Sequence, residues 1–197
     1  MAAGAETAVR LSVQALIQRD CDLAMRVRQD DEIIDRFEVE IDEMTIVLLT
    51  KAPLAGDLRL ISVAMKVSQN LERMGDEAAK IAKRARDLAQ EPAVTIDFDF
   101  DRLAGLSIDL VRAALDAFAR HDSTAARAII PRDRVVDSLN KEVQQQIVRH
   151  MTGNPDAIGR CLHWIVAAKG LERIADHAKN IAEEVVYLCE AQDIRHA

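Results

Sequence analysis

Four pairs of carboxylates, each with three residues between its two members, are the groups in this sequence with the clearest capacity for chemistry. The pairs are Asp31 and Asp35, Glu72 and Asp76, Asp133 and Asp137, and Glu172 and Asp176. Residues four apart share one face of a helix, and two carboxylates at that spacing repel each other by about 0.2–0.5 kcal/mol. Clustered carboxylate oxygens therefore favour a multivalent cation, with iron, manganese, magnesium or calcium preferred over softer metals.

An internal repeat places these pairs at corresponding positions of two related halves. The segment LERMGDEAAKIA at residues 71–82 recurs 100 residues later as LERIADHAKNIA at residues 171–182, with 7 of 12 positions identical. A fainter match aligns DEIID at residues 31–35 with DRVVD at residues 133–137, at an offset of 102. The sequence therefore predicts two related units, residues 1–92 and residues 97–197.

Apolar spacing predicts three helical segments in each half. The expected segments are residues 6–19, 22–50 and 57–89 in the first half, and residues 98–120, 123–151 and 155–192 in the second. Apolar residues recur at every seventh position of the long segments, as at Val27, Ile34, Ile41 and Leu48. Such heptads, in helices joined by short connections, specify antiparallel neighbours that cross at about 20°. The predicted fold class is all-α, a tandem repeat of two three-helix bundles with six antiparallel helices.

The position of the acidic pairs along each hairpin brings them to one level. About 17 residues separate the first pair from the end of its helix, and about 17 separate the start of the next helix from the second pair, roughly 26 Å in each case. The second half gives about 16 and about 19 residues, which differ by less than one helical turn. One pair alone is usually a solvated face, here with Arg28, Arg73, Lys80 and Arg173 nearby. Repetition at matching levels favours metal binding.

Composition excludes several classes of protein. With 26 Lys and Arg against 33 Asp and Glu, the net charge is -7, so the chain lacks the basic face of a nucleic-acid binder. Only 7 glycines and 4 prolines are present, fewer than turn-rich all-β folds need. The 3 cysteines have no metal-binding or disulfide spacing. Because no long apolar run or signal peptide occurs, we expect a cytoplasmic protein without direct membrane insertion.

The main enzymatic alternative is a carboxylate-bridged metal-storage protein or a di-metal helical-bundle enzyme. Such bundles use facing glutamates together with Glu-x-x-His motifs, and the sequence contains no Glu-x-x-His. His177, beside Asp176, is placed to add a nitrogen ligand, but a surface position on its helix is the favoured interpretation, and His163, near Trp164, is expected to be a packing residue. No Gly-rich phosphate loop or nucleophile elbow occurs, which disfavours a kinase, an NTPase or a hydrolase. We expect a protein that is not an enzyme and has no catalytic residues.

The two segments LERMGD and LERIAD, each preceded by a helix with a DxxxD pair, resemble the PhoU family of regulators of bacterial phosphate transport. The resemblance covers essentially the whole chain, including DLRL at residues 57–60. It implies a negative regulator of phosphate uptake and of phosphate-starvation signalling, often a homodimer. The implied partners are the ATPase subunit of the phosphate ABC transporter and a membrane sensor histidine kinase. Some family members hold multinuclear iron or zinc clusters, and their motifs correspond here to the four acidic pairs.

Three features depart from the family pattern. The first helix is short and should cover its neighbour only to about Asp35, leaving an apolar seam formed by Phe37, Ile41, Met44 and Leu48. We expect this seam to serve in dimerisation, or further residues to precede the first helix. Pro131 should kink its helix. The second half has Asn140 and Gln144 where the first has Glu38 and Asp42, which weakens the expectation of a metal in that half.

Overall fold

The protein is all-helical, as predicted. The computed structural model describes residues 1–51, 54–94 and 98–195, and in those ranges it contains six α-helices and one short 3-10 helix. The helices are α1 (Ala2–Gln18), α2 (Cys21–Leu49), α3 (Ala55–Ala89), α4 (Phe100–Arg120), α5 (Ser123–Gly153) and α6 (Ile158–Glu190), with the 3-10 helix η1 (Pro155–Ala157) just before α6. In the described part of the chain, no helix is both long enough and apolar enough to cross a membrane.

Local capping explains where several helices begin and end. Asp20 and Asp122 cap α2 and α5, because their Oδ1 atoms accept hydrogen bonds of 2.9 Å from the backbone N–H groups of Leu23 and Ala125. Asn154, which directly precedes Pro155 and is of a residue type that often caps helices, does not cap the following helix with its side chain. Its side chain donates to the His150 carbonyl at the end of α5 instead, and the 3-10 helix η1 separates it from α6.

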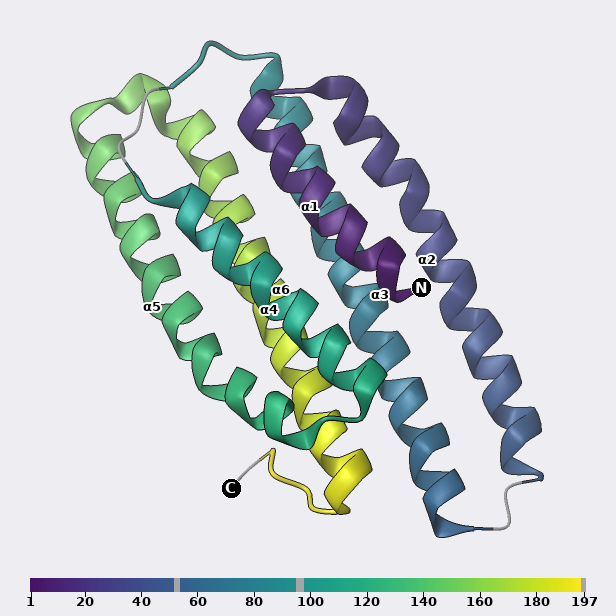
Figure 1. The fold of residues 1–197 in the computed structure, drawn as a ribbon. Helices are drawn as coiled ribbons and strands as arrows, with labels where there is room; N and C mark the ends of the chain where they lie inside the picture. Colours follow the sequence, from purple (N-terminus) through teal and green to yellow (C-terminus); the bar gives the residue numbers. More distant parts are fainter. Residues whose placement is uncertain (52–53, 95–97, 196–197) are drawn as a thin grey trace.

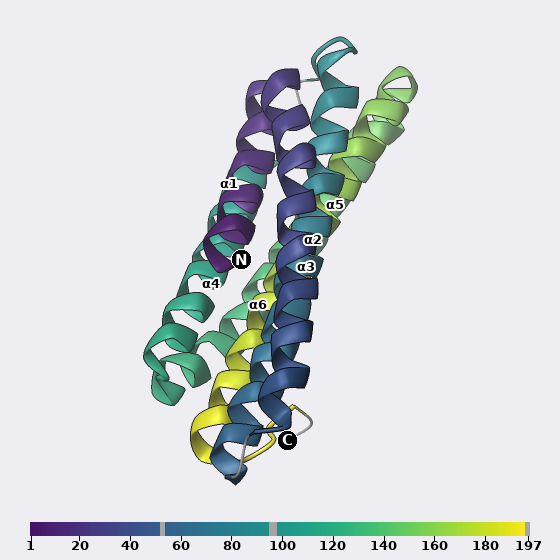
Figure 2. The same cartoon turned by 90° about the vertical axis from the view of Figure 1, so that its right-hand side faces the viewer.

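Each half forms a three-helix bundle, and the two bundles share one core. Helices α2 and α3 form one long hairpin and α5 and α6 form another, while α1 and α4 pack against α3 and α6 respectively (Figures 1 and 2). Helices α3 and α6 also pack along each other in the middle of the molecule, which joins the halves. Their buried side chains belong to one continuous cluster that includes Met74, Ile81, Leu171, Ile174 and Ile181.

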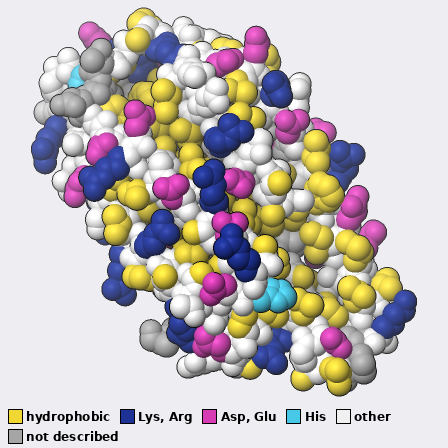
Figure 3. Space-filling view, viewed as in Figure 1, with side chains coloured by type: hydrophobic (Ala, Val, Ile, Leu, Met, Phe, Trp, Pro, Cys, Tyr) yellow, Lys and Arg dark blue, Asp and Glu magenta, His cyan; other side chains and the backbone are white. Residues whose placement is uncertain are grey.

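The apolar seam on α2 is uncovered, as predicted. Val27 and Ile34 are buried beneath α1, but Met44 and Leu48, further along the same helix, are 56% and 51% exposed. Figure 1 shows α1 beginning midway along the hairpin, and Figure 3 shows hydrophobic side chains on the lower right of that face. Met44, Leu48 and Phe118 of α4 line an apolar hollow beside the seam.

Pro131 does not interrupt its helix. Helix α5 runs continuously from Ser123 to Gly153 with Pro131 inside it. Proline removes one backbone donor from the helix interior, but the flanking helical turns remain, so Asp133 and Asp137 stay on one continuous helix. The acidic pair of this half is therefore displayed as the repeat predicts.

Candidate metal centre

The carboxylates of the first half lie on facing surfaces of α2 and α3, and they are called here the α2–α3 cluster. It comprises Asp31 and Asp35 of α2 and Glu72 and Asp76 of α3, continued along α2 by Glu38 and Asp42. Asp31 reaches α3 at Gly75, where an added Cβ atom would lie only 2.7 Å from Asp31 Oδ1. The absence of a side chain at Gly75 therefore permits the approach, and the predicted common level of the two acidic pairs is confirmed.

Electrostatic repulsion in the α2–α3 cluster is not fully compensated. Burial raises the pKa of Asp31 to about 6, assisted by the charges of Asp35 and Asp76 and opposed by Lys80. Burial also raises the pKa of Glu72, with Asp76 adding to the effect. The Oδ1 atoms of Asp31 and Asp42 are buried without a hydrogen-bond partner, an arrangement that is costly for polar groups.

The basic side chains closest to this cluster form ion pairs with carboxylates of α3 and not with those of α2. Arg73 lies 3.3 Å from Glu72 and 3.7 Å from Asp76, and Lys80 lies 3.7 Å from Asp76 and 3.1 Å from Glu77. Across the described ranges, the ion pairs in this region end on these α3 carboxylates and none reaches an α2 carboxylate. Among the described residues, the α2 carboxylates therefore have no ion-pair partner, although the more distant charges of Lys80 and Arg73 act on Asp31 and Glu38.

The carboxylates of the second half, the α5–α6 cluster, comprise Asp133 and Asp137 of α5 and Glu172 and Asp176 of α6. Here Lys179 of α6 bridges the two helices, with its Nζ 2.7 Å from Asp133 Oδ2 and 3.0 Å from Asp176 Oδ1. Burial alone would lower the pKa of Lys179, but the hydrogen bonds to Asp133 and Asp176 outweigh burial and raise it.

Two further features lower the negative charge of the α5–α6 cluster. A second lysine pairs with one of its carboxylates, and two neutral amides occupy the positions where α2 has two more carboxylates. Lys169 lies 2.5 Å from Oε2 of Glu172, one turn away along α6. Gln144 donates a 3.1 Å hydrogen bond to Asn140, so neutral amides bond to each other where α2 has Glu38 and Asp42. Asp133 is 3% exposed, and its second oxygen, Oδ1, has no hydrogen-bond partner. Glu172 Oε2 likewise has no hydrogen-bond partner and is balanced only by its ion pair with Lys169. Three of the four carboxylates of this cluster are therefore paired with lysines of α6.

Neither cluster has its donors drawn together on a single point. In the residues that the structure describes, no three His, Cys, Asp or Glu side chains are grouped closely enough to hold a metal ion. The carboxylates nevertheless face each other across each hairpin, so side-chain rotation on fixed helices is the movement that a bound cation would require. The donor set of the α2–α3 cluster fits a hard cation, since it offers oxygens, two of them buried and unpartnered.

His177 does not point to a metal site. Its Nδ1 lies 3.0 Å from Asn70 Oδ1 across the contact between α3 and α6, and burial lowers the pKa of its ring. Nearby, Glu77 of α3 is 7% exposed and accepts a 3.0 Å hydrogen bond from Arg173 of α6. These side chains join the two halves rather than complete a cluster.

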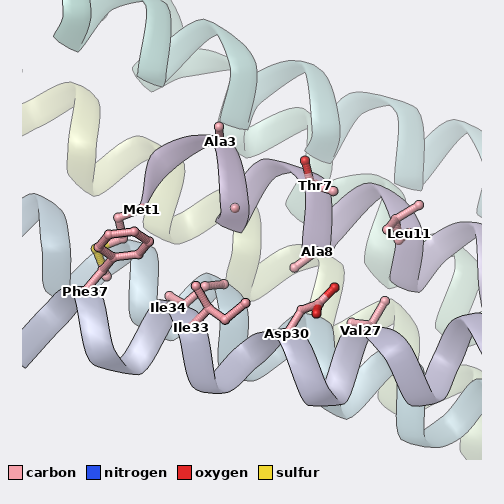
Figure 4. A pocket seen from close by; sticks show the side chains of 11 residues that line it. Met1, Ala3, Thr7, Ala8, Leu11, Val27, Asp30, Ile33, Ile34 and Phe37 are labelled. Atoms are coloured by element: carbon pink, nitrogen blue, oxygen red, sulfur yellow. The ribbon is translucent and has the colours of Figure 1, made fainter.

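The apolar groove between α1 and α2 contains none of the eight motif carboxylates. It is lined mainly by aliphatic side chains together with Phe37, and Figure 4 shows Asp30 of α2 pointing toward α1 near Ala8. Asp76 and Asp176 instead border a polar depression over the contact between α3 and α6, where Arg73, Lys80 and Arg173 also lie.

Comparison with known proteins agrees with the duplicated geometry. The PhoU domain matches residues 1–85 and again residues 100–185. The chain belongs to the PhoU family. A Pseudomonas aeruginosa relative, named as a phosphate-specific transport system accessory protein PhoU homolog, is 42% identical over 193 residues, covering 97% of this chain and 80% of its own. The Escherichia coli accessory protein PhoU is 33% identical over 186 residues, covering 94% and 77%.

Solved PhoU structures share the fold. The crystal structure of PhoU from Pseudomonas aeruginosa superposes with a TM-score of 0.93 at 39% identity, covering 98% of this chain and 93% of the other. The phosphate transport system regulatory protein PhoU from Streptococcus pneumoniae gives a TM-score of 0.89 at 26% identity, covering 96% and 90%. The predicted tandem repeat of three-helix bundles is thus confirmed as a PhoU fold.

Sequence reasoning missed the residue that most distinguishes the two PhoU repeats. Lys179 was not expected to reach Asp133, because a sequence does not show which way a long side chain points. A signal was nevertheless present, since the repeat aligns Lys179 with Ala79. Arg173, one of the basic residues near the acidic pairs, bonds to Glu77 of the other half.

Proposed function

We propose that this PhoU family member is an accessory and regulatory protein of a phosphate transport system, not an enzyme. The observation that carries the proposal is the match of both repeats to the PhoU domain, together with relatives named as accessory proteins of phosphate-specific transport. The Streptococcus pneumoniae relative is named as a regulatory protein of phosphate transport. In this role the chain restrains phosphate uptake and starvation signalling in the cytoplasm.

The proposed partners are the ATPase subunit of the phosphate ABC transporter and the membrane sensor histidine kinase. Docking of proteins suits the exposed acidic faces of the hairpins and the uncovered seam on α2 better than catalysis does. The seam carries Met44 and Leu48, each more than half exposed, and we assign it to a homodimer.

The proposal includes a cation at the family's acidic motifs. Iron, manganese or magnesium suits the all-oxygen donors of the α2–α3 cluster better than zinc, because zinc favours sites with histidine or cysteine. A bound cation supplies the direct ion-pair partner that the α2 carboxylates lack among the described residues. Asp31, Asp35, Glu72 and Asp76 would hold it. Asp133, Asp137, Glu172 and Asp176 form the corresponding motif set of the second half.

Pull-down experiments with the purified transporter ATPase and the kinase's cytoplasmic part test this role. The chain should retain both partners, and Glu72→Ala and Glu172→Ala identify which acidic face each partner contacts. Arg102→Ala, on an exposed part of α4, is a suitable control because its side chain pairs only with Asp99 among the described ion pairs. Failure of the unmodified chain to retain either protein, under conditions where another PhoU protein does so, would overturn the proposal.

A further inference from the structure

The two PhoU repeats differ in the positive charge that the chain itself supplies to each acidic cluster. At equivalent positions, 100 residues apart, α6 has Lys179 and α3 has Ala79. A second pair of equivalent positions differs in the same sense, with Lys169 in α6 and Gln69 in α3. Both lysines contact motif carboxylates. The second half therefore has two internal cations at positions where the first half has neutral residues.

Lys179 lies where a cation joining the two helices of a hairpin would lie. Its ammonium contacts one carboxylate from each helix, Asp133 of α5 at 2.7 Å and Asp176 of α6 at 3.0 Å. Asp133 is almost fully buried, and a charge in such a place is stable only with a partner. A metal ion entering between these two carboxylates would have to displace the ammonium.

Among the described residues of the first half, no basic side chain bridges the two helices in this way. Lys80, one residue after Ala79, pairs with Asp76 and Glu77, which belong to its own helix. The opposite helix, α2, keeps buried and unpartnered oxygens on Asp31 and Asp42. The α2–α3 cluster with its α2 continuation contains six carboxylates, against four in the α5–α6 cluster. The first half thus has more negative charge and lacks the bridging ammonium.

We propose that the two repeats balance their acidic motifs in different ways, so that a multivalent cation binds the α2–α3 cluster while Lys179 takes the cation's place in the α5–α6 cluster. The inference rests on the proposed cation binding of the PhoU motifs. It removes Asp133, Asp137, Glu172 and Asp176 from the metal site and assigns Asp133, Glu172 and Asp176 to ion pairs with Lys169 and Lys179. The protein then has one cation site, although its sequence repeats the motif in both halves.

Metal retention after loading tests the inference. The full chain is stripped with chelator, equilibrated with excess Mn²⁺, passed through a desalting column and examined by elemental analysis. We expect Asp76→Asn to lose at least nine-tenths of the bound Mn²⁺, whereas Asp176→Asn keeps the wild-type amount. Lys179→Gln should about double the ratio of Mn²⁺ to protein, and Ala79→Lys should abolish binding in the first half. Lys141→Ala, an exposed charge elsewhere on α5, is the control and should change nothing.

The melting temperature of the metal-free protein gives a second readout. Removing Lys179 leaves Asp133 buried without its partner, so Lys179→Gln should lower the melting temperature by about 5 °C in chelator, whereas Asp76→Asn should not lower it. Equal losses of Mn²⁺ in Asp76→Asn and Asp176→Asn would overturn this inference and leave cation binding standing. A wild-type chain that retains no Mn²⁺, Fe²⁺ or Zn²⁺ would overturn cation binding itself. If a folded Lys179→Gln variant retains the same amount of Mn²⁺ as wild type, Lys179 does not exclude a metal ion from the α5–α6 cluster, and the inference is overturned.

Discussion

Arg173 of α6 donates a 3.0 Å hydrogen bond to Glu77 of α3. Glu77 is 7% exposed, and the contact crosses from one PhoU repeat to the other. The equivalent residue in the first half, Arg73, pairs instead with Glu72 and Asp76 of its own helix. Arginines at equivalent positions of the two repeats therefore form different contacts, Arg73 within its own repeat and Arg173 between the repeats.

Removal of Arg173 should cost more stability than removal of Arg73. Arg173→Ala leaves Glu77 buried with Lys80 as its remaining cation, and we expect a loss of about 1–2 kcal/mol in the free energy of unfolding. Arg73→Ala removes an arginine that is mostly exposed and should cost less than about 0.5 kcal/mol. Urea unfolding of both variants compares the two values directly. Equal effects would contradict a special role for the contact between repeats.

The pKa of Asp31 predicts how the stability of the metal-free protein depends on pH. Its pKa is about 6 in the folded protein against an ordinary value of 3.8. Between these values the folded state binds more protons than the unfolded state, so stability falls as the pH rises and stays lowered above pH 6. Asp31→Asn should therefore match wild type near pH 4 and exceed it by about 1–2 kcal/mol above pH 6, allowing for partial exposure. Denaturant unfolding in chelator at several pH values measures this gap.

Saturating Mn²⁺ should reverse that order. A cation that binds only the folded state stabilises wild type by mass action, and Asp31→Asn should lose that gain. A higher stability of Asp31→Asn both with and without Mn²⁺ would indicate that Asp31 is not a ligand.

Substitution of Gly75 should disturb the α2–α3 cluster. Alanine in a helix interior is favoured over glycine by about 1 kcal/mol, and Gly105→Ala in α4, where nothing lies within 4 Å of the added Cβ atom, should gain about that amount. At Gly75 the added Cβ atom would meet Asp31 Oδ1 at 2.7 Å and Ile34 Cδ1 at 3.0 Å. We expect Gly75→Ala to be at least about 1 kcal/mol less stable than Gly105→Ala. It should also bind Mn²⁺ more weakly, because the Asp31 carboxylate must move. Thermal unfolding and Mn²⁺ titration measure the two effects.

Charges placed on the apolar seam should separate the proposed homodimer. Met44→Glu with Leu48→Glu alters two side chains that are more than half exposed, so the fold should keep its stability within about 0.5 kcal/mol. Light scattering should change from the mass of two chains to that of one. Val148→Glu, equally exposed on α5, controls for added charge. A wild-type chain that already scatters as a single chain would rule out the dimer.

The fold was predictable because its determinants are local and repeated. Heptads of apolar residues and few glycines fix long helices, and the observed helix α2 differs from its expected range by one residue at each end. The packing of α3 along α6 was not predictable in the same way. Both helices have apolar residues on more than one face, so a single sequence does not say which face meets α2 or α5 and which meets the other half.

The common level of the acidic pairs was predictable, but their charge balance was not. A rise of 1.5 Å per residue brings Asp31 level with the second acidic pair, and its contact with Gly75 confirms this. The different environments of the two clusters depend on a lysine side chain that extends from α6 to Asp133. Such a reach depends on side-chain rotamers and burial, which helical periodicity does not encode. Asn154 gives a smaller example, because its side chain bonds backward to α5 instead of capping the next helix.

The bridge from Lys179 to Asp133 also bears on how the chain folds. The hairpin of α5 and α6 contains its own counterion, so it can fold without a metal ion. Because α6 packs along α3, the folded second half provides a surface against which α3 can pack. We therefore expect amide hydrogen exchange in α2 to become faster when the proposed cation is removed, whereas exchange in α4, α5 and α6 should stay unchanged.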